Sequence, residues 1–231
     1  MIRFDRVSKR YGGDRDVVAQ LSFEIGDGEM VFISGRSGAG KSTVLALMAL
    51  LERPTQGQIW VNGEHLNKLR ARAIPRFRRQ IGLVFQAPRL LMERTVLDNV
   101  VMPLLVADVP SRERRSRVRV ALEQVGLSGS ERALADRLSS GERTRLEIAR
   151  AIVGRPVLLL ADEPTASLDK ATAGSVLELL QNVNRGGVTL VLATHDPELV
   201  RASGRREISL DRADAAAGGD LGTLPVIAAV R

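Results

Sequence analysis

The feature that most constrains the fold is a glycine-rich loop, GRSGAGKS, at residues 35–42. It follows the apolar run MVFIS at residues 30–34 and leads into residues 41–51, which have helical character. The loop fits the pattern G-x-x-x-x-G-K-[ST], whose glycines let successive backbone N–H groups turn inward around an anion. The N-terminus of the following helix adds partial positive charge at the same place. This order of strand, loop and helix predicts a phosphate-binding cradle on an α/β fold.

Each polar position of the loop has an expected contact with a nucleoside triphosphate. We expect Lys41 to reach the β- and γ-phosphates and the Ser42 hydroxyl to ligate Mg²⁺. Thr43 is expected to contact the α-phosphate. The remaining phosphate contacts are assigned to the loop positions Gly35, Ser37, Gly38 and Gly40. The alternative, an ordinary glycine-rich turn, is disfavoured because a chance match to the whole pattern is rare in this composition.

Two adjacent carboxylates end a second apolar run. Residues 157–163 read VLLLADE, so the run leads directly to Asp162 and Glu163. In open α/β sheets ligands bind at the carboxyl ends of the strands, which places both side chains near the phosphates. Asp162 is expected to hold Mg²⁺ through water, and Glu163 to orient the attacking water or to accept its proton. The alternative is a polar strand end that begins a loop and has no chemical role.

Composition narrows the reaction classes. A phosphate loop by itself is compatible with kinases, GTPases and many ATPases. A GTPase is disfavoured because the sequence has no N-K-x-D motif for guanine recognition. The absence of cysteine excludes disulfides and thiol catalysis, and two histidines, His65 and His195, are too few for a His-rich metal centre. No apolar stretch approaches the roughly 18–20 residues of a membrane span, and the N-terminus lacks an apolar signal core. We therefore expect a cytoplasmic hydrolase of nucleoside triphosphates.

The chain begins with hairpin signals and continues as alternating strands and helices. Residues 2–25 hold two strand-like runs separated by Gly12-Gly13, and Asn62-Gly63 marks a second hairpin. Helical segments at 141–153 and 171–184 then alternate with apolar strands at 157–161 and 188–193. This order predicts a mostly parallel sheet that is covered by helices.

Two other segments are expected outside that sheet. Residues 70–125 are predicted to be mostly helical and polar, with breaks at four prolines. Residues 211–231 contain nine Ala or Gly and no clear periodicity, so we expect a loosely ordered tail there.

Positive charge is concentrated in one part of the chain. The formal net charge is +7, and residues 68–119 hold 13 basic side chains against four acidic ones. Most of these basic residues form two clusters, Arg70, Arg72, Arg76, Arg78 and Arg79, and then Arg112, Arg114, Arg115, Arg117 and Arg119. They predict either a solvated arginine-rich face or a surface for a polyanion, which is nucleic acid or an anionic membrane. Aromatic residues make up only 3% of the chain, which argues against base stacking on single strands.

A third motif lies between the loop and the carboxylates. Residues 138–142 read LSSGE, followed by Arg145 and a helical segment. Together with the loop, the Asp162-Glu163 pair and the downstream His195, this order resembles the nucleotide-binding subunits of ABC transporters. The resemblance implies one α/β domain over residues 1–210: an ATPase core with a parallel sheet, an N-terminal antiparallel β subdomain and a helical subdomain inserted at about residues 87–155. It also implies ATP and Mg²⁺ as cofactors.

The resemblance further implies a homodimer with ATP at its interface. In that family the residues matching Ser139, Ser140 and Gly141 bind ATP held by the other subunit, and Asp169 matches the loop through which the two halves communicate. The usual motif is L-S-G-G-Q, so Ser140 and Glu142 depart from it. The Ser140 side chain adds bulk where the backbone closes on phosphate, or its hydroxyl donates a hydrogen bond. A non-hydrolysing scaffold is the alternative that this departure raises.

Three more residues take roles from the resemblance. Tyr11 matches the aromatic residue that stacks on adenine. Gln86 matches the glutamine that contacts Mg²⁺ and the attacking water and senses the membrane subunit. His195 matches the histidine that contacts the γ-phosphate, whereas a lone histidine after a strand is more often structural. With Glu163, the residues Gln86 and His195 form the expected catalytic set.

Three stretches, at residues 1–11, 90–100 and 160–165, are similar to the bacterial cell-division subgroup of these ATPases. Members of the subgroup pair with a membrane protein and regulate cell-wall hydrolases, which implies attachment to the cytoplasmic face of the plasma membrane. Residues 90–100 follow Gln86, where the family docks its membrane subunit. The alternatives are lipoprotein-release or macrolide-export ATPases and, more distantly, a soluble ATPase acting on nucleic acid or ribosomes. Nucleic acid is not the expected partner.

Overall fold

The computed structural model of the chain describes residues 1–13, 15–87 and 89–211. Its centre is a five-stranded parallel sheet in the order β6-β7-β8-β3-β9. The strands are β3 (Met30–Ser34), β6 (Ile81–Val84), β7 (Leu158–Asp162), β8 (Thr189–Thr194) and β9 (Arg206–Ser209). Because the strands are parallel, their carboxyl ends meet at one edge of the sheet.

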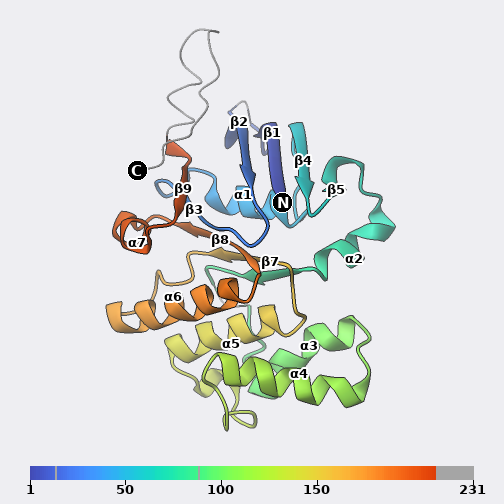
Figure 1. Cartoon of the computed structure of the whole chain (residues 1–231), viewed down its shortest axis with the longest axis vertical. Coiled ribbons are helices and arrows are strands. Elements are labelled where there is room, and N and C mark those ends of the chain that lie inside the picture. The colour runs from blue at the N-terminus through green and yellow to red at the C-terminus, as the bar shows by residue number, and fades with distance from the viewer. Residues whose placement is uncertain (14, 88, 212–231) are drawn as a thin grey trace.

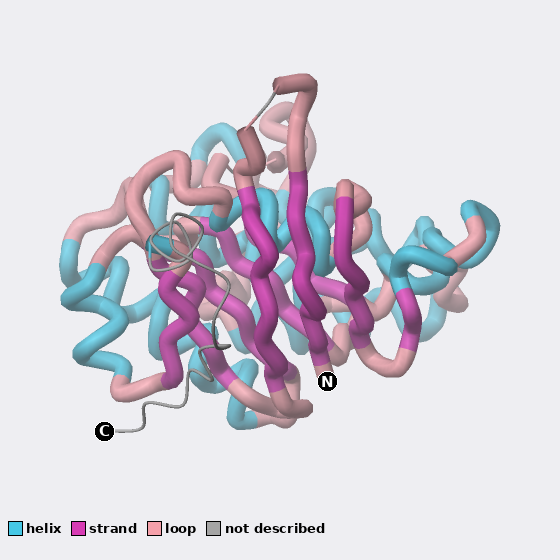
Figure 2. Tube along the Cα trace, turned by 90° about the horizontal axis from the view of Figure 1, so that it is seen from above, coloured by secondary structure: helices cyan, strands magenta, loops and turns pink. Residues whose placement is uncertain are grey.

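A second, antiparallel sheet packs on the first across helix α1 (Lys41–Met48), as Figure 1 shows and Figure 2 repeats from above. In the order β2-β1-β4-β5, its strands are β1 (Ile2–Lys9), β2 (Val18–Ile25), β4 (Gln56–Val61) and β5 (Glu64–His65). The predicted hairpin at Asn62-Gly63 is confirmed, since β4 and β5 pair across it with Trp60 opposite His65.

Helices cover the other face of the parallel sheet (Figure 1). Helices α5 (Ser140–Ile152) and α6 (Lys170–Arg185) lie next to the sheet, and α3 (Val96–Val106) and α4 (Ser111–Gln124) lie outside α5. The smaller helices are α2 (Ile74–Arg78), α7 (Pro197–Ser203), η1 (Leu66–Lys68), η2 (Ala71–Ala73) and η3 (Ala135–Arg137). None of the helices in the described part of the chain has the length and apolarity that crossing a membrane requires.

Alternate side chains of the parallel strands face two separate hydrophobic cores. Phe32 and Leu192 belong to the core shared with helices α3 to α6. Ile33 and Val191 belong to the core shared with α1 and the antiparallel sheet. Both faces of the sheet are therefore buried at its central strands, which explains why β3, β7 and β8 are apolar at nearly every position rather than at every second one.

One strand lies inside the segment that was predicted to be mostly helical. β6 occupies part of residues 70–125 and pairs in parallel with β7. Its apolar run is short and follows arginines, so sequence periodicity does not reveal it. Gly82 lets α5 pack on this strand, because an added Cβ would lie 2.7 Å from the Ala151 carbonyl oxygen. The tail expected over residues 211–231 lies outside the described residues, apart from Asp211.

Candidate nucleotide-binding site

A cavity of about 430 Å³ opens at the carboxyl edge of the parallel sheet. Its walls are formed by Val17, Ser37, Gly38, Gly40, Lys41, Ser42, Thr43, Gln86, Glu163 and His195. All of them except Val17 are residues that the sequence predicts to contact the nucleotide, Mg²⁺ or the attacking water.

The pairing of four neighbouring strands explains why these residues meet. The glycine-rich loop follows β3, Gln86 follows β6, Glu163 follows β7 and His195 follows β8. The register places the last residue of β3 opposite the last residue of β8, and the last residue of β6 opposite Ala161, one residue before the end of β7. Parallel pairing thus gathers side chains from four distant parts of the chain at one edge.

The N-terminus of α1 forms the base of the cavity. Gly40 precedes the helix with φ 92°, in the left-handed region, and an added Cβ would lie 2.8 Å from the Val17 carbonyl oxygen. Another residue would therefore be strained and would collide with backbone. Among the described residues, no side chain caps α1 by a hydrogen bond. The first N–H groups of this helix are thus available to an anion.

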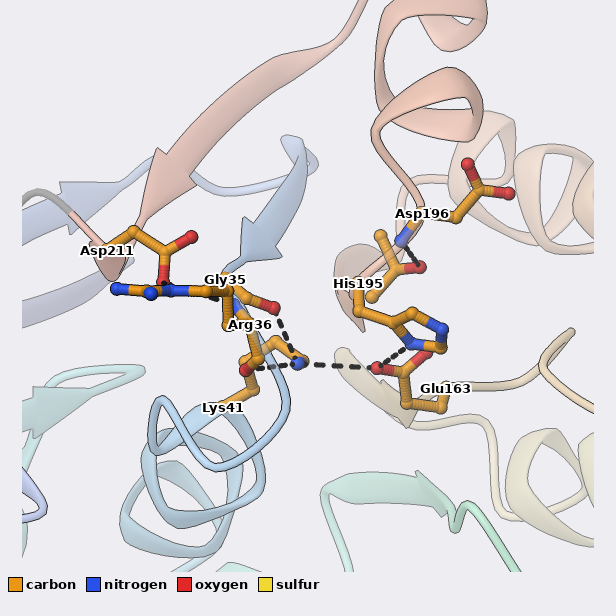
Figure 3. A network of polar contacts seen from close by, with 8 residues as sticks. Gly35, Arg36, Lys41, Glu163, His195, Asp196 and Asp211 are labelled. Atoms are coloured by element: carbon orange, nitrogen blue, oxygen red, sulfur yellow. Dashed lines mark hydrogen bonds and ion pairs between the residues drawn. The ribbon is translucent and has the colours of Figure 1, made fainter.

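Buried Lys41 connects the loop to Glu163 (Figure 3). Its Nζ donates to the carbonyl oxygens of Gly35 at 2.8 Å and Arg36 at 3.1 Å, and lies 3.4 Å from Glu163 Oε1. His195 Nδ1 lies 2.8 Å from the same carboxylate oxygen. The Glu163 side chain is 8% exposed and the His195 side chain 59%. The carboxylate is held between a cation and an imidazole at the cavity wall, where it can accept a proton from water.

The backbone of Glu163 is strained. Its φ is 49°, in the left-handed region that a residue with a side chain rarely adopts. Its N–H donates to the Ala193 carbonyl oxygen at 3.0 Å, which fixes this conformation against β8. Strain of this kind costs on the order of 1–3 kcal/mol and persists where surrounding structure imposes it, often at functional sites.

Asp162 and Ser42 offer oxygen atoms that suit a divalent cation. Asp162 Oδ1 is buried and, within the described residues, has no hydrogen-bond partner. Burial raises the pKa of Asp162, and a hydrogen bond with the Ser42 side chain acts in the opposite direction. A buried carboxylate is costly unless a cation or a proton neutralises it. One carboxylate and one hydroxyl beside a phosphate cradle are a donor set that fits Mg²⁺.

The residues Ser139, Ser140 and Gly141 of the LSSGE motif, which we call the signature, lie at the N-terminus of α5 and do not line the cavity of their own chain. Ser139 Oγ accepts the N–H of Glu142 at 3.3 Å, and Glu142 Oε2 accepts the Ser139 N–H at 2.8 Å. These reciprocal bonds form a capping box. The hydrogen bonds from Ser139 hold the pKa of Glu142 below its usual value. Ser140 is exposed, whereas Gly141 is buried.

Gly141 packs against the start of α6. A Cβ added to Gly141 would lie 2.6 Å from Thr172 Cγ2. Thr172 is itself fixed by Asp169, because its Oγ1 donates to Asp169 Oδ2 at 2.6 Å and its N–H to Oδ1 at 3.0 Å. The structure therefore brings the signature and Asp169 together, at a place separate from the cavity.

Tyr11 lies in the connection between β1 and β2 and does not line the cavity either. Its side chain is 47% exposed, and Lys9 Nζ lies 4.6 Å from the centre of its ring. Val17, in the same connection, does line the cavity, and its N–H donates to the Lys9 carbonyl oxygen at 2.8 Å. The adenine contact of Tyr11 stays a prediction.

Two residues of α5 hold the segment around Gln86 and were not predicted. Glu147, 1% exposed, accepts the N–H of Phe85 through Oε1 at 3.3 Å. Arg150 donates to the Arg89 carbonyl oxygen at 2.6 Å and lies 3.6 Å from the Glu147 carboxylate. Burial raises the pKa of Glu147. Their sequence signal is weak, a Glu and an Arg three positions apart in a largely buried helix.

Asp211 is a second unpredicted contact of the glycine-rich loop. Its Oδ1 accepts the N–H of Arg36 at 3.1 Å and lies 3.5 Å from Arg36 Nε (Figure 3). The end of β9 is thereby attached to the outer side of the loop.

Known proteins share this arrangement. Residues 18–166 match the family model described as ABC transporter. The cell division ATP-binding protein FtsE of Escherichia coli (strain K12) is 46% identical over 210 residues, covering 91% of this chain and 95% of that protein. FtsE of Mycobacterium tuberculosis is 45% identical over 215 residues, covering 92% and 94%. The methionine import ATP-binding protein MetN of Geobacillus kaustophilus is 42% identical, covering 87% of this chain and 60% of that protein.

A solved structure shows the same fold. The dimeric ATP-binding cassette MJ0796, in a post-hydrolysis state bound to ADP and Pi, superposes with a TM-score of 0.81 at 32% identity. The superposition covers 90% of this chain and 94% of that one.

Proposed function

The chain belongs to the ABC transporter family as an ATP-hydrolysing nucleotide-binding subunit, and we propose that it acts in a cell-division complex of the FtsE type. The resemblance to these ATPases predicted from the sequence is confirmed by the family match and by the identity to FtsE. The proposed complex contains two copies of this chain and an FtsX-type membrane protein, at the cytoplasmic face of the plasma membrane. ATP-driven closure of the two copies would act on that partner, which controls cell-wall hydrolysis.

One observation carries the chemical part of this proposal. Lys41, Glu163 and His195 form a continuous chain of contacts at the wall of one cavity, between a phosphate cradle and the strand end that bears the carboxylates. A buried carboxylate beside phosphates, with its orientation set by two neighbours, suits the activation of water for attack on a γ-phosphate.

We assign the following roles to the residues around the cavity. The N–H groups of α1 and the Lys41 ammonium bind the phosphates, and Thr43 contacts the α-phosphate. Ser42, Asp162 and Gln86 would hold Mg²⁺, which neutralises charge on the phosphate oxygens when bound. Glu163 orients the attacking water and accepts its proton. His195 contacts the γ-phosphate.

The position of the signature residues supports a dimer. Ser139 and Gly141 start a helix but do not line the cavity of their own chain, so a phosphate contact by them requires a second copy. MJ0796, a structural neighbour, is a dimer. We propose that Ser139, Ser140 and Gly141 of each copy close on the ATP held by the other, and that Asp169, fixed to Gly141 through Thr172, moves with them.

The segment after Gln86 offers a surface for the membrane partner. Leu91, Met92 and Leu97 are exposed there at 38%, 36% and 42%. Asn99 holds the backbone of Leu91 in place, because its Oδ1 accepts the Leu91 N–H at 2.8 Å and its Nδ2 donates to the Leu91 carbonyl oxygen at 3.0 Å. Exposed apolar side chains that follow Gln86 closely in sequence, where Asn99 holds the Leu91 backbone, support docking that is coupled to the nucleotide. A lipoprotein-release or macrolide-export complex, with another membrane partner on the same surface, is the alternative.

Replacing the proposed base tests the chemical part of the proposal. Glu163→Gln is expected to lower ATP turnover by about 10²- to 10⁴-fold, because general-base catalysis contributes that much. ATP binding should persist, and ATP-loaded dimer should accumulate in size-exclusion chromatography. Glu178→Gln, on the exposed side of α6, is the matched control. Turnover at the unmodified rate in Glu163→Gln would refute the assignment of the base.

Co-purification tests the proposed membrane partner and the proposed role in cell division. The chain is expected to co-purify with an FtsX-type membrane protein of its own organism and to hydrolyse ATP faster in that complex. Serine substitutions of Leu91, Met92 and Leu97 should abolish co-purification and leave ATP binding unchanged. Co-purification with the membrane protein of a lipoprotein-release or macrolide-export complex would instead refute the cell-division assignment and support that alternative.

A further inference from the structure

One corner of the molecule combines arginines with exposed apolar side chains. It consists of residues 66–80, with helix α2, and residues 102–119, with the end of α3 and the start of α4; we call it the basic corner. The two segments are joined directly, since Arg79 Nη2 donates to the Val106 carbonyl oxygen at 3.0 Å. Both lie at the same side of the molecule in Figure 1, away from the phosphate cradle.

The charge of the basic corner is not compensated locally. Residues 66–80 contain six basic side chains and no acidic one, and residues 102–119 contain five against two. Among the described residues, the one ion pair within the corner is Arg117 with Glu113. The exposed basic residues of the corner that form no ion pair with a described residue are Lys68, Arg70, Arg72, Arg76, Arg78, Arg79, Arg112, Arg115 and Arg119. Elsewhere exposed arginines do pair, as Arg3 does with Glu24 and Arg206 with Glu29.

Apolar side chains project from the same corner. Met102, Leu105 and Val106 at the end of α3 are 38%, 49% and 67% exposed. They lie three and four positions apart, so they share one face of the helix. The opposite face of α3, with Val100 and Leu104, is buried in the core.

We propose that the basic corner is a membrane-contact surface that binds anionic phospholipids directly. Arginines attract the negative headgroups, and the three apolar side chains at the end of α3 enter the headgroup region. A merely solvated arginine face would have no reason to keep Leu105 and Val106 exposed among the charges. A surface that stacks nucleic-acid bases would present exposed aromatic side chains between the arginines, and the one aromatic residue of the corner, Phe77, is buried.

The contact goes beyond the proposed function because it needs neither ATP nor the membrane partner. It is compatible with that function, since α3 starts in the segment proposed to dock the partner and ends in the basic corner. The helix has 11 residues, about 16 Å in length, so a partner seated at its start would stand close to the corner.

The contacts of individual arginines decide which variants test the proposal. Arg78 Nη2 donates to the Leu50 carbonyl oxygen at 2.7 Å, and Arg79 holds the end of α3, so replacing either would disturb the fold. The informative variant is the triple charge reversal Arg70→Glu, Arg72→Glu and Arg76→Glu. The matched control, with the same change of net charge outside the corner, is Arg132→Glu, Arg185→Glu and Arg205→Glu. The double change Leu105→Gln and Val106→Gln tests the apolar part.

The test measures co-sedimentation of the purified chain with lipid vesicles. We expect binding to vesicles of phosphatidylcholine mixed with phosphatidylglycerol and little binding to phosphatidylcholine alone. The corner triple variant should bind at least about 100-fold more weakly, because each basic residue near an anionic surface contributes about 1 kcal/mol. Leu105→Gln with Val106→Gln should weaken binding by about 5- to 10-fold. The control triple should lose less than about 3-fold, and ATP affinity should be equal in all variants.

Three outcomes would overturn the proposal. The first is no binding of the unmodified chain to the anionic vesicles at low salt. The second is an equal loss in the control triple, which would show attraction by net charge without a specific surface. The third is tighter binding to duplex DNA or RNA than to vesicles, lost in the corner triple variant, which would assign the corner to nucleic acid. Since ATP turnover and partner co-purification are separate measurements, failure here would leave the proposed function intact.

Discussion

The chain contains two helix N-termini that face ATP in the proposed dimer, and they are built in opposite ways. Helix α1 follows Gly40 and begins with the buried Lys41, and no side chain of the described residues caps it. Helix α5 follows Ser139, whose backbone and side chain exchange hydrogen bonds with Glu142. The start of α1 offers its N–H groups to an anion, whereas at the start of α5 the N–H groups of Ser139 and Glu142 already donate to a carboxylate and a hydroxyl.

This difference assigns ATP binding by a single subunit to the start of α1 and ATP-dependent closure of the dimer to the start of α5. The α1 cradle is complete within one chain, so it should determine how tightly a single subunit binds ATP. At the start of α5, residues 139–141, which we call the α5 tip, the Ser139 hydroxyl donates to Glu142 Oε2 and in the proposed dimer would exchange this bond for one to a phosphate of the partner's nucleotide. Because that contact replaces an existing hydrogen bond, its net gain is small. The tip is therefore suited to a reversible, ATP-dependent closure.

Lys41→Ala should have the largest effect, and it should act on the cradle alone. The variant loses charge-assisted hydrogen bonds to phosphate, worth about 1.5–3 kcal/mol each. ATP affinity of the single subunit should fall by at least about 100-fold in isothermal titration calorimetry. Lys68→Ala, an exposed lysine outside the cavity, is the control. An unchanged ATP affinity in Lys41→Ala would mean that α1 is not the principal phosphate site.

Gly141→Ala should have an intermediate effect, confined to the tip. The added methyl collides with Thr172 Cγ2, which Asp169 prevents from moving, and overpacking of this kind costs about 1–3 kcal/mol. Thermal unfolding should shift downward and ATP-dependent dimerisation should be lost, while the single subunit still binds ATP. Adding Thr172→Ser removes the methyl and keeps the hydroxyl for Asp169, so the double variant should regain stability. If it does not, contact with Thr172 is not the reason for glycine at this position.

Ser139→Ala should have the smallest effect and needs a matched cap as its control. Loss of the helix cap costs about 1 kcal/mol. Thr95 caps α3 through the same kind of box with Asp98, away from the cavity, so Thr95→Ala should cost similar stability. Only Ser139→Ala should weaken ATP-dependent dimerisation, by about 10-fold, as measured by analytical ultracentrifugation with Glu163→Gln in the background. Equal weakening of dimerisation in both variants would mean that Ser139 acts only as a helix cap.

The two helix starts also differ in how far they could be predicted. The cradle is a contiguous motif, so its glycines, lysine and serine identify both the site and the strand and helix around it. The tip was located only through a family resemblance, and its packing against Thr172 has no signal in the sequence. Glu147 and Arg150, which hold the segment around Gln86, are a similar case. A buried carboxylate in a helix looks like an ordinary surface residue until its partners are known.

Local sequence was sufficient for the phosphate loop, the carboxylate pair, the hairpin at Asn62-Gly63 and the apolar strands, because each depends on neighbours along the chain. β6 depended on tertiary structure, since its short run becomes a strand only by pairing with β7. The tertiary structure alone decided that Glu163 lies between Lys41 and His195, that the signature stays outside the cavity of its own chain, and that the arginines of two separate segments form one corner. These arrangements arise from strand register and helix packing, which join residues far apart in sequence and leave no periodic pattern to read.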